Sequence, residues 1–467
     1  MKPGPEAGRR EPPAPALLDR ALKPFGDVRP GEGTTVLLMS LSVHVLLVAY
    51  YVLKTVREPL ILVAGGAEIK SYAAGAQALS LVFYVPFYGW LAARLPRQRF
   101  LTAIVLLFVG CIELFVFGGR TSLPHIGFLF YVWVGIFNLT TIAQFWSYAN
   151  EIYDRAQGER LFPLIAIGAA AGAPLGAALA EGLFTRGVSP FAMMQVAAAI
   201  LLLHLALYRV VGRRMRAAGN VARQTPIERG NGFALVLRSR YLGLIALLLV
   251  LLNIAKTVGE YILGRSVLSA ADAHLAAAAG FDRQAFIGAF YGSFFFWTNV
   301  ATILLQAFLV SRLVKWRGMA GVVLALPVVA LGAYAIAAIG VGLALLRFLK
   351  IAENATDYSI TNTAKQMLWL PTSREEKYNA KQAIDTFFVR GGDMLAAGLV
   401  FVGTHILVLN AAGFARANVV VVAMALGAGV VLLREHRRLT TAPATPSSPA
   451  IADGKGRWPW AARRAAG

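Results

Sequence analysis

The sequence is poor in the residues on which enzymes and metal sites most often depend. Its 467 residues include one cysteine, Cys111, and six histidines. A single cysteine excludes a disulfide within the chain and a cysteine-rich metal site. Neither a His-Glu-x-x-His zinc motif nor a Gly-x-x-x-x-Gly-Lys-Ser/Thr phosphate loop occurs. We therefore predict a protein that is not an enzyme, with no catalytic residues, no metal site and no cofactor.

Charged residues are also scarce, and apolar residues take their place. Only 15% of the residues are charged, 57% are hydrophobic, and the mean hydropathy is +0.61. A soluble protein of this length is more polar, whereas apolar runs of about 20 residues can cross a bilayer as helices. We count about twelve such runs: 34–56, 71–93, 100–118, 124–149, 161–183, 188–211, 241–264, 285–311, 318–338, 342–367, 383–407 and 414–434. The sequence therefore predicts an all-α integral membrane protein whose surroundings are a lipid bilayer.

Acidic residues are the rarer of the two charged classes. The chain has 24 Asp and Glu against 45 Lys and Arg, which gives a net charge of +21. The basic residues gather in connections that share one face of the predicted bundle: Arg94, Arg97, Arg99, Arg209, Arg213, Arg214, Arg216, Arg223, Arg229, Arg238, Arg240, Arg312, Lys315 and Arg317. The connections on the other face hold few, chiefly Arg120, Arg186, Arg265 and Arg283. The positive-inside rule then predicts cytoplasmic termini, and this topology accounts for the charge without a nucleic-acid partner.

The two ends of the chain differ in composition from its apolar middle. The first 33 residues are rich in Pro, Gly and charge, and they lack the apolar core and cleavage site of a signal peptide. The residues after Arg434 are rich in Pro, Ser and Arg, a composition typical of disorder. We predict a disordered tail at 1–33, a six-helix bundle at 34–211, a basic cytoplasmic linker at 212–240, a second six-helix bundle at 241–434 and a disordered basic tail at 435–467.

A short motif occurs twice, about half a chain apart. Lys54-Thr-Val-Arg-Glu58 ends the first apolar run, and Lys256-Thr-Val-Gly-Glu260 lies in the seventh. A second pair of similar segments, 91–99 and 309–317, follows the second and eighth runs. Each copy holds six runs, and an even number gives both copies the same orientation in the membrane. Two parallel six-helix repeats are the fold of major-facilitator transporters, which bind substrate between the halves near the midplane.

The tenth run, 342–367, is the most polar of the twelve. Its polar residues recur at steps of three or four, which places most of them on one helix face: Arg347, Lys350, Glu353, Asn354, Asp357, Thr361, Asn362 and Lys365. Polar groups at membrane depth face protein or water rather than lipid, so we predict that this face lines a central cavity. Alternatively, Lys350 pairs with Glu353, and Asp357 with Thr361 or Lys365, and these pairs hold the bundle together.

The eleventh run, 383–407, carries fewer charges, namely Asp385, Arg390 and Asp393. Arg390 is followed by two glycines, so a phosphate could approach it closely and be held by its bidentate fork. Either aspartate could equally neutralise this arginine. The sequence leaves both possibilities open.

The two lysines of the repeated motif also have two interpretations. Lys54 and Lys256 each precede a glutamate by four residues, and their matching positions in the two copies favour a role at the substrate. Alternatively, each is an interfacial anchor that snorkels to the membrane surface. In the fifth run, Gly168, Gly172 and Gly176 have the spacing of close helix packing.

Three stretches resemble the ATP/ADP translocases of plastids and of intracellular bacteria, the nucleotide transporter family. They are 145–152 with 160–164 and Gly168, 365–371 with 377–385, and 54–58. The resemblance covers most of the predicted membrane domain, and it implies a major-facilitator-type bundle that exchanges nucleotides across a bacterial inner membrane. It also implies nucleotide recognition or coupling by Lys54, Glu151 and one lysine among three: Lys365, Lys377 and Lys381. The chain departs from the family at Gln366, where the family has an acid, and at 256–260, which fits its seventh helix loosely.

A nucleotide substrate agrees with the charges of the predicted cavity. ATP and ADP carry roughly three or four negative charges, which leave water only if several Lys and Arg are already in place. The candidate substrate-binding residues are Lys54, Lys256, Arg347, Lys350, Lys365, Lys381 and Arg390. The candidate coupling or gating residues are Glu58, Glu151, Glu260, Glu353, Asp357 and Asp385. An empty cavity of this charge resists closure and a bound anion permits it, which predicts exchange of ATP for ADP.

Two other functions stay open. In the first, Glu58, Glu260, Glu353 or Asp357 carries a coupling proton, and the substrate is an organic phosphate or another metabolite. In the second, the bundle is a membrane sensor or scaffold that transports nothing, and its basic tails bind partners or anionic lipid. The sequence indicates no obligatory protein partner.

Overall fold

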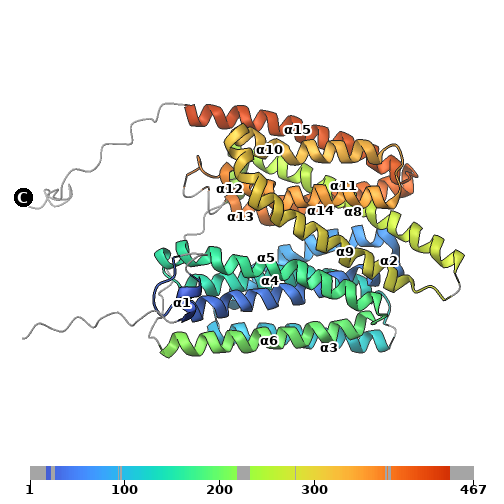
Figure 1. Ribbon diagram of the computed structural model, residues 1–467. Coiled ribbons are helices and arrows are strands. Elements are labelled where there is room, and N and C mark those ends of the chain that lie inside the picture. Colours follow the sequence, from blue (N-terminus) through green and yellow to red (C-terminus); the bar gives the residue numbers. More distant parts are fainter. Residues whose placement is uncertain are drawn as a thin grey trace, which may run out of the picture.

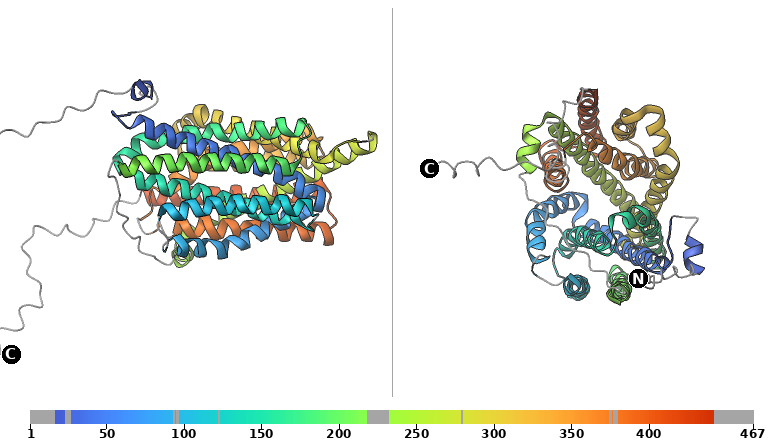
Figure 2. Two further views of the ribbon diagram at one scale, coloured as in Figure 1. Left: turned by 90° about the horizontal axis from the view of Figure 1, so that it is seen from below. Right: turned by 90° about the vertical axis from the view of Figure 1, so that its left-hand side faces the viewer.

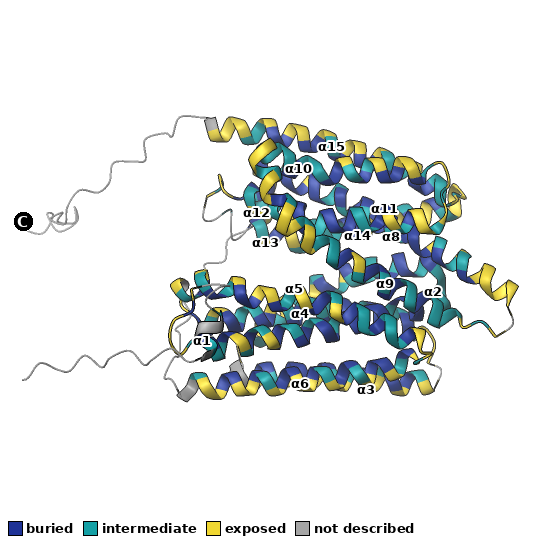
Figure 3. Ribbon diagram, viewed as in Figure 1, coloured by how far each residue is buried: buried dark blue, intermediate teal, exposed yellow. Residues whose placement is uncertain are grey.

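The computed structural model describes residues 17–22, 27–92, 94, 97–121, 123–217, 232–278, 280–373, 376 and 380–441. Within this part of the chain every regular element is a helix. Nine helical stretches of the described residues are long and apolar enough to cross a membrane. Large apolar side chains project from their outer faces, as at Phe83 and Leu114, which are 71% and 70% exposed. Figure 3 shows exposed residues on the outside of the bundle and buried ones inside, and lipid suits the apolar outer faces.

Two of the nine stretches cross twice, because a glycine breaks each of them. Helix α2 (Gly33–Ala92) turns at Gly66, where φ is 73°. The second stretch comprises α9 (Arg283–Leu304), the π-helical η2 (Leu305–Val310) and α10 (Ser311–Ala337), and it turns at Gly318, where φ is 60°. Both values lie in the left-handed region that glycine adopts without steric cost. The first break divides the first crossing from the second, and the other divides the eighth from the ninth.

The other crossings are single. The first half continues with α3 (Arg97–Arg120), α4 (Ile126–Ile152), α5 (Arg155–Thr185) and α6 (Pro190–Ala217). In the second half, α8 (Arg240–Ala277) and α15 (Ala411–Thr441) are each one crossing. A third crossing is the stretch of α11 (Leu343–Thr356), η3 (Asp357–Thr361) and α12 (Asn362–Leu368). A fourth is the stretch of α13 (Lys381–Ala383), η5 (Ile384–Phe388), α14 (Val389–Phe401) and η6 (Val402–Ile406). The stretch from α11 to α12 is too polar to be one of the nine. With it, the described helices cross six times in each half.

The two halves form two groups of helices. Figure 1 shows α2 to α6 below and α8 to α15 above, and the end-on view in Figure 2 separates the same groups. The first half has an apolar core of its own around Phe130, Phe137 and Phe145. The predicted fold class, an all-helical bundle of two six-helix halves, is confirmed.

Several helices extend beyond the predicted runs. Helix α2 continues past residue 56 to its break, so Arg57 and Glu58 lie inside a helix. Helix α6 reaches Ala217 and α7 (Gly232–Arg238) lies in the segment predicted as a linker. Helix α1 (Leu17–Leu22) lies in the predicted amino-terminal tail, and α15 reaches seven residues past Arg434. Residues 1–16, 218–231 and 442–467 lie outside the described residues.

Two acidic side chains fix the start of α2. The carboxylate of Asp19 accepts hydrogen bonds from the backbone N–H of Gly31 at 3.0 Å and of Gly33 at 2.9 Å. Glu32 accepts from Arg160 of α5, with 3.0 Å between Oε1 and Nη2. Burial opposes ionisation of Glu32, but the hydrogen bonds and charge of Arg160 outweigh it and hold the pKa of Glu32 below its usual value. This pair joins α2 to α5 at one end of the bundle.

Three glycines let α5 approach α2 closely, as their spacing predicts. A Cβ atom at Gly168 would lie 2.3 Å from the backbone oxygen of Ser40. A Cβ at Gly172 would lie 2.5 Å from the backbone oxygen of His44, and one at Gly176 would lie 2.6 Å from that of Val48. These distances are shorter than any real contact, so glycine at these places is a packing requirement.

Replacing Gly172 with leucine is expected to lower the melting temperature of the detergent-solubilised protein by roughly 5 °C, because overpacking moves α5 away from α2. Fluorescence-detected gel filtration after heating measures this change. Gly332 of α10 is the matched control, since a Cβ there would meet no atom within 4 Å in the described structure. Equal melting temperatures for Gly172→Leu and Gly332→Leu would contradict the packing role.

Helix α1 and the last turn of α15 lie at one end of the bundle (Figure 1). The halves contact each other from the middle of the bundle to the other end. At that end His405 Nε2 lies 2.6 Å from Glu68 Oε1. Near the middle the Tyr51 hydroxyl donates to Asn299 Oδ1 at 2.9 Å. Both contacts join a residue of α2 to a residue of the second half.

Candidate functional site

A cavity of about 270 Å³ lies between the two halves, at the level of the repeated motif. Its charged lining residues are five cations and two carboxylates, so its charge is positive: Lys54, Arg57, Lys70, Lys256, Arg390, Glu260 and Asp393. Aromatic and amide side chains complete much of the wall: Tyr50, Tyr131, Phe295, Tyr358, Gln77, Asn138, Asn253 and Asn354. A concave site with convergent polar groups suits a small molecule.

Lys54 differs from the other four cations of this cavity, because it has no carboxylate partner in the described structure. Its side chain comes from α2 and is 9% exposed. The ammonium lies 4.2 Å from the ring centroid of Phe295 and 4.9 Å from that of Tyr51. Such cation–π contacts offset only part of the cost of removing an ammonium from water. Its burial does not fit an interfacial anchor, whose charged head stays in water.

Lys70 joins the two copies of the repeated motif. Its Nζ lies 2.7 Å from Glu58 Oε2 and 3.6 Å from Glu260 Oε2. Glu58 is fully buried and also pairs with Arg57, at 2.6 Å between Oε1 and Nη2. Because Glu58 belongs to the first half and Glu260 to the second, Lys70 connects the halves beside the cavity.

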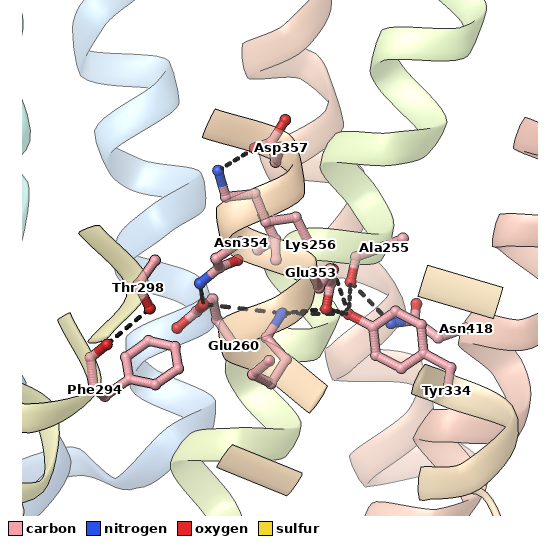
Figure 4. Close-up of polar contacts among 12 residues, drawn as sticks. Ala255, Lys256, Glu260, Phe294, Thr298, Tyr334, Glu353, Asn354, Asp357 and Asn418 are labelled. Atoms are coloured by element: carbon pink, nitrogen blue, oxygen red, sulfur yellow. Dashed lines mark hydrogen bonds and ion pairs between the residues drawn. The ribbon is translucent and has the colours of Figure 1, made fainter. Parts of the chain in front are cut away.

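Lys256 occupies the place in the second half that Lys54 occupies in the first. Its Nζ lies 2.7 Å from Asp357 Oδ2 and 4.5 Å from the ring centroid of Tyr358. Figure 4 shows this ion pair between α8 and the start of η3. A second cavity of about 210 Å³ shares four wall residues with the first: Asn253, Lys256, Asn354 and Arg390. The two cavities are therefore neighbours.

The polar face of the tenth run, 342–367, both lines a cavity and forms ion pairs, the two roles that its sequence suggests. Lys350 is 1% exposed and its Nζ lies 2.7 Å from Glu353 Oε2, as in the predicted ion pair. The hydroxyl of Tyr334 donates to the same carboxylate at 2.8 Å (Figure 4). Asp357 instead pairs with Lys256 of another helix. Five residues of this face line the second cavity: Glu353, Asn354, Asp357, Thr361 and Lys365.

Arg390 is neutralised by Asp393, one of the two aspartates considered from the sequence. Its Nη1 lies 3.3 Å from Asp393 Oδ2. That carboxylate also accepts from Asn253 at 2.7 Å and from Thr257 at 2.8 Å. Arg390 nevertheless lines both cavities and is 31% exposed, so its guanidinium can also meet a ligand.

Glu58 and Lys350 lie behind the cavity walls rather than in them, and four further candidate residues also lie outside the walls of both cavities. Arg347 donates to Ser293 Oγ at 2.6 Å, and Lys381 donates to Gln366 Oε1 at 2.9 Å. Glu151 is the second-last residue of α4, and Asp385 lies on η5. The structure does not bring these four together with Lys54 and Lys256. Lys377, which the family resemblance singles out, lies outside the described residues.

The sequence interpretation missed several residues of the cavity. Lys70 precedes the second apolar run on the side where basic residues are few, and that position is the one signal it gives. Two buried amide oxygens in the wall, Oδ1 of Asn138 and of Asn354, have no hydrogen-bond donor in the described structure. Asn354 uses its Nδ2 to donate to Glu260 at 3.1 Å. Its free oxygen can therefore accept from a ligand.

No protein-family model matches the chain. Similar curated proteins are named ADP,ATP carrier protein 1: that of Chlamydia trachomatis is 24% identical over 476 aligned positions, which cover 83% of this chain and 87% of the relative. The Chlamydia muridarum protein of the same name matches to the same extent.

Solved structures of similar fold are transporters. The nucleoside transporter NupG superposes with a TM-score of 0.59 at 14% identity, over 88% of this chain and 100% of that one. A mutant of the peptide transporter POT has a TM-score of 0.60 at 13% identity, over 91% and 99% of the two chains. A bacterial ferroportin homologue in its inward-facing state scores 0.59 at 13% identity, over 85% and 98%. This chain has the major-facilitator fold. Together with the carrier relatives, the comparisons support an integral membrane transporter.

Proposed function

We propose that this transporter exchanges adenine nucleotides, ATP against ADP, across its membrane. The observation that carries the proposal is Lys54, a buried cation without a carboxylate partner in the described structure, in the wall of a positively charged cavity between the halves. An anion at that place would compensate its charge. The relatives named ADP,ATP carrier protein support a nucleotide as that anion.

The cavity also contains partners for the part of a nucleotide that is not phosphate. The unpartnered acceptor oxygens of Asn138 and Asn354 match donors such as the adenine amino group or the ribose hydroxyls. Tyr50, Tyr131 and Tyr358 provide aromatic faces in the same wall, and bases stack on such rings. Inorganic phosphate or pyrophosphate would contact the cations but not these amide oxygens and aromatic rings.

Exchange follows from the same charge balance. With no anion bound, the cavity keeps an excess of positive charge at Lys54, and burying that charge without a counter-ion in a medium of low dielectric constant opposes closure of the cavity. A nucleotide neutralises that excess, so the two halves can rock around it and expose it on the other side. In this conformation the halves touch from the middle to the end opposite α1, and the cavity would open toward the end that carries α1.

Purified protein tests substrate choice by thermal shift. ATP and ADP are expected to raise the melting temperature by several degrees at millimolar concentration, because only the folded state binds them. Adenosine and pyrophosphate, each lacking one half of the ligand, should raise it much less. An equal shift with pyrophosphate and ATP would contradict recognition of the nucleoside part.

Proton-coupled transport of another anion is the alternative for the same cavity. Its four candidate proton carriers already have cationic partners: Glu58 with Lys70, Glu353 with Lys350 and Asp357 with Lys256, each at 2.7 Å, and Glu260 with Lys70 at 3.6 Å. A proton would have to break one of these ion pairs, so the geometry favours exchange. Uptake into liposomes that follows an imposed pH gradient, without internal nucleotide, would reverse this preference.

A further inference from the structure

A third hollow lies on the outer flank of the first half, far from the second half. It has a volume of about 500 Å³ and lies between the beginning of α3 and the end of α6. These two helices run side by side at the lower edge of the bundle in Figure 1, and the end-on view of Figure 2 keeps them at that edge. We call this hollow the flank groove. Its walls are Arg99, Thr102, Ala103 and Leu106 of α3 and Tyr208, Arg209 and Arg213 of α6.

The sequence explains why these residues share a groove. On α3 the four wall residues follow the spacing of a single helix face, and on α6 Arg209 and Arg213 are one turn apart. Along the groove the chemistry changes from charged to apolar. Arg99 lies in the first turn of α3, whereas Leu106, two turns deeper, is 45% exposed toward the surroundings.

The positive charge of the flank groove is not compensated. Arg99, Arg209 and Arg213 are all exposed, and none of them has an ion pair or hydrogen bond with a described residue. Arg160, at the same end of the bundle, instead pairs with Glu32. The acidic residue of α3, Glu113, lies two turns beyond Leu106 and accepts a hydrogen bond from Gln195 of α6. Three arginines therefore line one groove, and no acidic residue of the two helices lies in its wall.

We propose that the flank groove binds one anionic phospholipid of the leaflet on the side of α1. The three arginines hold the phosphate of its headgroup, since guanidinium binds phosphate oxygens in a bidentate manner. The acyl chain lies along Ala103 and Leu106. A basic groove between membrane helices with an apolar floor fits an anionic lipid better than a soluble phosphate, which gains nothing from that floor. The inference is independent of the transported solute.

The test titrates detergent-solubilised, full-length protein with phosphatidylglycerol and follows its melting temperature. Wild-type protein is expected to bind it, and to retain it in native mass spectrometry, in preference to phosphatidylcholine. The triple variant Arg99→Gln, Arg209→Gln, Arg213→Gln should bind about 100-fold more weakly, because each basic residue near a lipid surface contributes several-fold. Glycerol phosphate should produce no shift; a shift equal to that of the lipid would overturn the choice of ligand.

Two controls separate the groove from general charge. The variant Arg312→Gln, Lys315→Gln, Arg317→Gln removes three exposed basic residues outside the groove and should bind phosphatidylglycerol like the wild type. The variant Ala103→Trp keeps all three arginines but fills the apolar part, and it should also weaken binding at least about tenfold, which corresponds to 1.4 kcal/mol. If the Arg99, Arg209, Arg213 variant binds as tightly as its control, or if Ala103→Trp binds like the wild type, the proposal is wrong.

Discussion

Replacing Lys54 with glutamine is expected to reduce ATP uptake into ADP-loaded liposomes by about 30-fold or more. Removal of one partner of a buried charged contact costs about 2–5 kcal/mol, and each 1.4 kcal/mol is a factor of ten. The same change removes a buried ammonium that has no carboxylate partner in the described structure. The melting temperature of the substrate-free variant should therefore be unchanged or higher. Lost transport with retained stability distinguishes a ligand contact from a structural one.

Lys315→Gln is the matched control for this experiment. It also removes one lysine, but Lys315 is exposed at the start of α10, away from both cavities. Uptake by this variant should equal that of the wild type. The role assigned to Lys54 would be contradicted if Lys54→Gln transported at the wild-type rate, or if it lost transport and thermal stability together.

A disulfide between positions 75 and 397 is expected to stop transport. Gly75 lies on α2 and Ala397 on α14, and a Cβ built at Gly75 would lie 3.1 Å from that of Ala397. Disulfides need Cβ atoms about 3.5–4.5 Å apart, so a small relaxation suffices. The bond would tie the first half to the second, whereas alternating access requires the halves to separate here. Uptake should fall to the level of protein-free liposomes after oxidation and return after reduction.

The background for this pair is Cys111→Ala, which removes the one cysteine of the sequence. Mass spectrometry of the linked peptides establishes that the bond has formed. Gly75→Cys and Ala397→Cys alone, treated with the same oxidant, should keep their uptake. Normal transport by protein that is fully crosslinked would mean that the two halves do not move apart at this place.

Much of the fold could be predicted because hydrophobic length and the repeat are local properties of the sequence. Runs of about 20 apolar residues specify crossings without tertiary information. The repeated motif also predicted that Lys54 and Lys256 occupy matching places, and both line one cavity. The helix ends were less predictable: α2 continues through Arg57 and Glu58 because the chain turns only at Gly66.

The cavity wall was predictable only in part, because it depends on which helix faces meet across the two halves. Helical spacing places Lys350 and Asp357 on one face, but the first lies in a buried ion pair with Glu353 while the second pairs with Lys256 of α8. The spacing of residues around Lys70 gave no signal of its role. Its partners Glu58 and Glu260 come from different halves, so the contacts depend on how the halves pack together. Contacts between distant segments are properties of the packed bundle.

The most direct test of the account is uptake of labelled ATP into liposomes that contain the purified protein and are loaded with ADP, with phosphate or with neither. Exchange in a positively charged cavity predicts rapid uptake with internal ADP and little uptake into phosphate-loaded or empty liposomes. Equal uptake under all three conditions would contradict exchange. No uptake under any of them, by protein shown to be folded, would contradict a nucleotide substrate.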